Sequence, residues 1–105
     1  MGEQHVRRNI FVLSMIAATS CAKFSSKQIT EAKSNCAEFY KEKRGEPSHD
    51  IKPERVWEKD GKLVVEIADR EHADDTSYNV DYCIVDTKEG TMFLPSAFER
   101  ARWEK

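Results

Sequence analysis

The sequence predicts a small α+β domain: an N-terminal helix packed on an antiparallel sheet of three to four strands, with a short C-terminal helix after it. Three observations support this fold class. Residues 26–44 have the apolar spacing of an amphipathic helix, the dipeptide Asp60-Gly61 lies between two apolar runs, and residues 77–86 alternate in polarity. Together they predict one helix followed by a hairpin and a further strand.

The predicted helix covers residues 26–44. Ser25 and Gln28 have the spacing of a capping box at its start, and Gly45 with Pro47 ends it. The apolar residues that recur at helical spacing form the expected inward face: Ile29, Ala32, Cys36 and Phe39. We therefore expect the Cys36 side chain to point into the core.

A loop and a hairpin are predicted next. Residues 45–53 hold two prolines and one apolar residue, which is typical of a loop. Residues 55–59 and 62–67 flank Asp60-Gly61, a strong signal for a two-residue hairpin turn. Alternation places one set of side chains on the core face of the second strand: Leu63, Val65 and Ile67.

The third strand is expected over residues 77–86, after an exposed acidic connection at residues 69–75. Its more apolar face carries Tyr78, Val80, Tyr82 and Ile84. Cys83 and Val85 lie on the other face, so Cys83 meets the helix only if the helix covers that face or a bulge re-aims the side chain.

A turn over residues 87–90 then leads into a short strand over residues 91–94. Pro95 ends regular pairing and is suited to an early helical position. Four apolar residues around it have helical spacing and predict the short terminal helix: Leu94, Ala97, Phe98 and Ala101.

The first 21 residues have a different character from the rest. Arg7 and Arg8 precede an uncharged stretch, residues 9–20, which ends in small residues before Cys21. This arrangement resembles the signal peptide of bacterial lipoproteins, in which the cysteine is lipidated and becomes the new N-terminus. The resemblance implies a signal peptide at residues 1–20, a lipidated tether at 21–25 and a single domain at 26–105.

The same resemblance implies a location. A lipidated Cys21 would anchor the domain to a membrane in the periplasm, and Ala22 in place of an aspartate favours the outer membrane. Two alternatives remain open. An ordinary secretory signal cut after Ser20 would give a secreted or soluble periplasmic protein, and residues 10–18 would be a core helix if the protein were cytosolic. That apolar run is shorter than the roughly 20 residues that a membrane-spanning helix needs.

The three cysteines fit the exported interpretation. Lipidation of Cys21 would leave Cys36 and Cys83 as a pair in an oxidising compartment. A bridge between them would stabilise a domain of this size by roughly 4 kcal/mol in the chain-entropy model. The alternative is that both are buried thiols.

Composition and motifs argue against several functional classes. The chain has 17 Lys and Arg against 19 Asp and Glu, so no basic excess indicates a nucleic-acid partner. His49 and His72 lie in polar loops outside any metal-ligand motif, and the acidic residues around His72 lack the spacing of a calcium loop. We therefore expect no enzymatic activity, no cofactor and no metal, although a hydrolase with a dispersed site remains a weaker alternative.

Binding to a protein partner is the remaining expectation, in addition to membrane attachment through the lipid anchor. Aromatic residues and arginines dominate protein interfaces, and four of them are the candidate partner-binding residues: Trp57, Arg100, Arg102 and Trp103. The predicted function is a binding or inhibitory module, such as an immunity protein or an inhibitor of an envelope hydrolase. An accessory subunit of an envelope assembly or secretion complex is the alternative.

Overall fold

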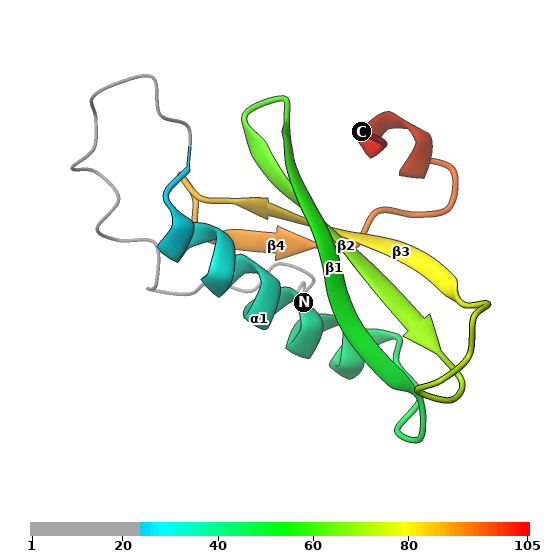
Figure 1. Cartoon of the computed structure of the whole chain (residues 1–105). Helices are drawn as coiled ribbons and strands as arrows, with labels where there is room; N and C mark the ends of the chain where they lie inside the picture. Colours follow the sequence, from blue (N-terminus) through cyan, green and yellow to red (C-terminus); the bar gives the residue numbers. More distant parts are fainter. Residues whose placement is uncertain (1–23) are drawn as a thin grey trace.

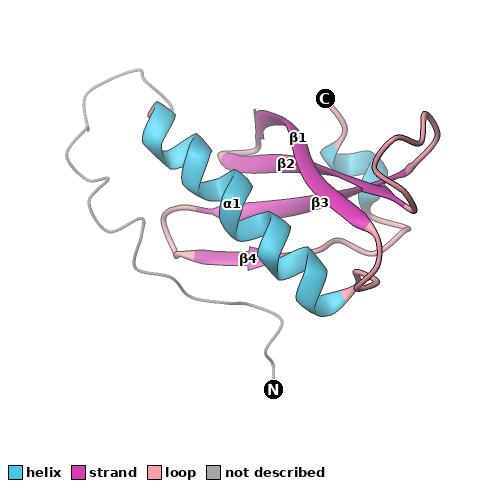
Figure 2. Ribbon diagram, turned by 60° about the horizontal axis from the view of Figure 1, so that its bottom comes forward, coloured by secondary structure: helices cyan, strands magenta, loops and turns pink. Residues whose placement is uncertain are grey.

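A computed structural model describes residues 24–105 as one helix on a four-stranded antiparallel sheet (Figure 1). The strands lie in chain order, and Figure 2 shows the helix across one face of the sheet. The predicted α+β class is confirmed. The predicted signal peptide, residues 1–20, and the predicted lipidation site, Cys21, lie outside the described residues.

Five elements and a short terminal turn make up the domain, and most follow the predicted ranges. They are α1 (Ser26–Lys43), β1 (Asp50–Lys59), β2 (Lys62–Arg70), β3 (Asn79–Asp86), β4 (Thr91–Phe93) and the 3-10 helix η2 (Arg100–Trp103). Among the described residues, no helix is both long and apolar enough to cross a membrane.

The start of α1 is capped as predicted. The Ser25 hydroxyl accepts a hydrogen bond from the backbone N–H of Gln28 at 3.0 Å. In return the Gln28 side chain accepts one from the Ser25 N–H at 2.9 Å. Two backbone donors that the helix leaves without partners are thereby satisfied.

The end of α1 requires a glycine for a steric reason. The backbone N–H groups of Arg44 and Gly45 both donate to the Tyr40 carbonyl. A β-carbon at position 45 would lie 2.7 Å from Cδ1 of Ile51 and 2.9 Å from the Lys41 Cα, closer than van der Waals contact allows. Only glycine lets the chain turn from the helix into β1 at this distance.

β1 begins earlier than predicted. The loop predicted to extend to Pro53 ends before Asp50, where strand pairing starts. β1 is an edge strand, so the missing N–H of Pro53 removes no hydrogen bond from the interior of the sheet. The pairing with β2 shifts register between Pro53 and Val56, as a bulge does.

The β1–β2 hairpin has the predicted turn. Asp60 and Gly61 have φ angles of 52° and 78°, the two positive values that a type I′ turn requires. Because this turn fixes the register, the side chains of Leu63, Val65 and Ile67 share one face of β2 and are all buried.

The main core lies between α1 and this face of the sheet. Cys36 and Cys83 form a disulfide across it, with their Cα atoms 5.9 Å apart. The helix covers the face of β3 that carries Cys83 and Val85, which removes the geometric difficulty that the sequence presented. The buried members of this core are Ala32, Cys36, Phe39, Tyr40, Ile51, Leu63, Val65, Ile67, Cys83, Val85 and Met92.

Candidate functional site

A second apolar cluster covers the opposite face of the sheet, and it involves the C-terminal segment. Its buried members are Trp57, Val64, Tyr82, Ile84 and Trp103. Figure 1 shows η2 on the side of the sheet away from α1. Leu94, Ala97, Phe98 and Ala101 predicted a short terminal helix. The structure has a 3-10 turn over Arg100–Trp103 in its place, and the buried residue of this turn is Trp103.

The two candidate tryptophans lie together in this cluster. Trp57 and Trp103 are 8% and 3% exposed, and the indole N–H of Trp57 donates to the Trp103 carbonyl oxygen at 2.9 Å. The ring of Trp57 meets Tyr82 edge to face, with centroids 5.6 Å apart. Both indoles thus pack within the chain, and the accessible candidate groups on this face are the guanidinium groups.

Arginines stack on aromatic rings along this outer face. Arg102 lies 4.7 Å from the centroid of Trp103, Arg55 lies 5.3 Å from that of Trp57, and Arg100 lies 5.9 Å from that of Tyr82. Such cation–π contacts hold a guanidinium flat against the surface while its edge stays in water. The candidate residues Arg100 and Arg102 therefore border the apolar cluster to which Trp103 belongs.

Phe98 is the residue that sequence reasoning missed. Helical spacing had assigned it to the predicted terminal helix, and it was not among the four candidate partner-binding residues, but its side chain is 97% exposed. It is one of two large hydrophobic residues exposed in the described part of the chain, and the other, Tyr78, is covered on its ring by Arg70 at 4.0 Å. The only feature of the sequence that pointed to an exposed Phe98 was its position between Pro95 and the two arginines.

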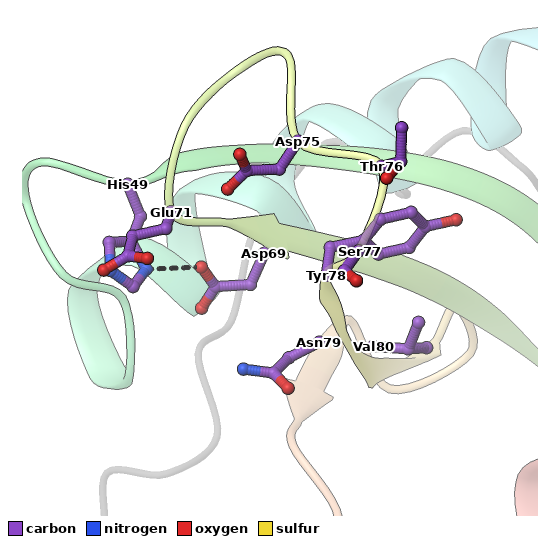
Figure 3. A pocket seen from close by; sticks show the side chains of 9 residues that line it. All are labelled: His49, Asp69, Glu71, Asp75, Thr76, Ser77, Tyr78, Asn79 and Val80. Carbon is purple, nitrogen blue, oxygen red and sulfur yellow. Dashed lines mark hydrogen bonds and ion pairs between the residues drawn. The ribbon is translucent and has the colours of Figure 1, made fainter.

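A polar hollow lies at the other end of the sheet (Figure 3). Nδ1 of His49 lies 2.7 Å from Oδ1 of Asp69, and the Tyr40 hydroxyl donates to Oδ2 of the same carboxylate at 2.8 Å. Asp69 is buried, so these two contacts satisfy both of its oxygens. The hollow is open, and its lining is His49, Asp69, Glu71, Asp75, Thr76, Ser77, Tyr78, Asn79 and Val80.

This network ties the end of α1 to the sheet. Burial, reinforced by the adjacent Asp69 carboxylate, raises the pKa of Tyr40 well above its usual range, so the hydroxyl stays protonated as a donor. Beside it, Nη1 of Arg44 pairs with Oδ2 of Asp81 at 2.6 Å. Both contacts join the last turn of the helix to β2 and β3, which is a structural role.

The acidic connection after β2 forms a tight turn. The backbone N–H of His72 donates to the Asp75 carboxylate at 3.0 Å, and the Asp75 N–H donates to the His72 carbonyl at the same distance. Within residues 24–105, no group of three histidine, cysteine or acidic side chains is arranged to hold a metal ion. The hollow can offer hydrogen bonds and negative charge to a ligand.

Comparison with protein families, with curated proteins and with solved structures gives no match for this chain.

Proposed function

We propose that this chain is a small periplasmic lipoprotein, anchored to the outer membrane through acyl chains on Cys21, that acts as a binding or inhibitory module for an envelope protein. The observation that carries the binding role is Phe98, whose side chain is 97% exposed beside two arginines. Aromatic residues and arginines are the side chains that most often supply binding energy at protein interfaces.

The disulfide supports the exported location. Disulfides persist in oxidising compartments and are rare in the cytosol. Cys36 and Cys83 are both fully buried, and their bridge joins the helix to the third strand of a domain with a small core. A chain that needs this bridge for stability would be poorly suited to a reducing compartment.

Intact mass measurement tests the location and the anchor. Protein extracted from membranes should begin at Cys21, carry acyl mass and gain the mass of two hydrogen atoms when a reducing agent opens the disulfide. The Cys21→Ser variant should lose the acyl mass and leave the membrane fraction. A product that begins at Met1 with three free thiols would overturn the exported interpretation.

Photo-cross-linking in living cells tests the binding role. A photo-reactive phenylalanine analogue at position 98 of the full chain should give a discrete protein adduct after irradiation. The matched control is the same analogue at position 38, on the exposed face of α1. Identical adducts from the two positions, or none from position 98, would contradict the proposal, and the identity of the adduct would distinguish an inhibited hydrolase from an assembly subunit.

A further inference from the structure

The segment that carries Phe98 is fixed at both of its ends. At its start, Nη2 of Arg44 donates to the carbonyl oxygens of Leu94 and Pro95 at 3.4 and 3.3 Å. At its end, the Trp103 carbonyl accepts the Trp57 indole N–H, and Nζ of Lys59 donates to the next carbonyl, that of Glu104, at 2.9 Å. The sheet and the helix therefore hold a projecting loop from two sides.

Backbone hydrogen bonds also order the loop internally. The N–H of Glu99 donates to the Ser96 carbonyl at 3.0 Å, and the N–H of Arg102 donates to the Glu99 carbonyl at 3.1 Å. Phe98 lies within these successive turns, flanked by exposed Ala97. Because the backbone of this loop is already ordered, a partner that binds Phe98 does not have to order the loop, which lowers the entropic cost of binding.

Arg100 differs from the other arginines of the outer face in its charge environment. Arg55 pairs with Glu66, Arg70 with Glu54 and Arg102 with Asp60. Within the described residues Arg100 forms no ion pair, and its guanidinium lies over the ring of Tyr82, 5.9 Å from the centroid. Its guanidinium can therefore donate hydrogen bonds to a carboxylate of a partner without breaking an ion pair inside the described part of the chain.

We propose that Phe98 and Arg100 together dock into an apolar socket of the protein partner, with Phe98 filling the socket and Arg100 pairing with a carboxylate on its rim. The inference rests on the proposed function and names the chemistry of the partner. A buried aromatic side chain next to a charge-assisted hydrogen bond is the usual composition of a binding hot spot.

A membrane surface is the less favoured occupant because of the charges around Phe98. Glu99 and Glu104 alternate with Arg100, Arg102 and Lys105 in this segment, and the whole chain has a net charge of −2. Binding to anionic lipid requires clustered basic residues, which this segment lacks. A protein socket needs only an apolar pocket for the Phe98 ring and one carboxylate that pairs with Arg100.

The test uses the full-length lipoprotein with the photo-reactive analogue at position 101, which is exposed, directly follows Arg100 and lies three residues from Phe98 in the sequence. At low expression, where adduct yield follows occupancy, Phe98→Ser should reduce the protein adduct by about thirtyfold. Arg100→Gln should reduce it by about tenfold, whereas Arg100→Lys should retain part of it. Lys88→Gln, which removes an exposed charge in the β3–β4 turn, is the matched control and should leave the yield unchanged.

The outcomes separate this inference from the proposed function. If no analogue on this segment gives a protein adduct, the proposed function fails. If an adduct forms but its yield is unchanged by Phe98→Ser and by Arg100→Gln, the proposed docking of Phe98 and Arg100 into a socket is wrong, while the binding role stands. Unchanged thermal midpoints of the variants should show that the fold is intact.

A second experiment with lipid vesicles tests whether the loop binds the membrane. In vesicles that contain brominated lipids, tryptophan fluorescence of the anchored protein should not be quenched, because Trp57 and Trp103 both lie near this segment and away from lipid. Quenching that disappears in Phe98→Ser would assign the loop to the bilayer and overturn the proposal.

Discussion

Trp57 and Trp103 are joined by a hydrogen bond from the indole N–H of the first to the backbone carbonyl of the second, at 2.9 Å. The bond joins the first strand to the last turn of the domain, which are 46 residues apart. Because Trp103 is also buried against the sheet, this contact decides which side of the C-terminal segment faces inward and which side presents Phe98.

Trp103→Ala should destabilise the domain by about 3 kcal/mol, since it removes a buried indole and leaves a cavity beside Trp57. Denaturant unfolding would measure the loss. Phe98→Ala in the same segment is the matched control and should change the free energy of unfolding by less than about 0.5 kcal/mol, because the ring is solvent-exposed. Equal effects of the two substitutions would contradict the arrangement of this segment.

The disulfide should supply a large part of the stability. The double variant Cys36→Ala and Cys83→Ala should unfold with a free energy about 4 kcal/mol lower than the oxidised parent, because the bridge restricts the unfolded chain. Urea denaturation with and without a reducing agent checks this. The reductant should destabilise only the parent, and an equal response of the double variant would show that the effect is not due to the bridge.

Tyr40→Phe should cost about 1–2 kcal/mol, because Asp69 loses one of two hydrogen-bond partners in a buried site. The pH dependence has a definite sign. The raised pKa of Tyr40 contributes stability that is present below pH 10.0, the ordinary tyrosine value, and is lost as the pH rises through the folded-state value. Unfolding measured at pH 8 and pH 11 should show a smaller alkaline loss in the variant than in the parent.

Glu66 should contribute stability with the opposite dependence on pH. The hydrogen bonds from Arg55, both 3.0 Å long, lower the pKa of Glu66 from its ordinary 4.5. The contribution is therefore present above pH 4.5 and is lost as the pH falls through the lowered value. Since Arg55 is largely exposed, we expect Glu66→Gln to cost less than about 1 kcal/mol at pH 7.

The same variant should cost less at pH 2 than at pH 7, because protonation of Glu66 in the parent removes the charge from the pair as the pH falls through the lowered pKa. Chemical denaturation at the two pH values measures both differences. A cost that stays constant between pH 7 and pH 2 would show that the pair acts through packing and not through charge.

Sequence pattern was sufficient where a local interaction fixes the structure. The capping box of Ser25 and Gln28, the turn at Asp60-Gly61 and the inward face of the helix all depend on neighbouring residues, and each was predicted. The exposure of Phe98 was not predicted, because a terminal turn is too short for helical periodicity to define a face. It also missed the pairing of His49 with Asp69, which lie 20 residues apart and meet only when β1 and β2 align.

The sequence by itself determined the elements, the turn that joins the hairpin and the cysteine pair available for a bridge. Only the tertiary structure decided which face of β3 packs against the helix, because this strand is apolar on both faces. Periodicity cannot distinguish two such faces. The choice is made by packing: the disulfide fixes the helix over Cys83 and Val85, and Trp103 then covers Tyr82 and Ile84 on the other side, leaving Phe98 exposed.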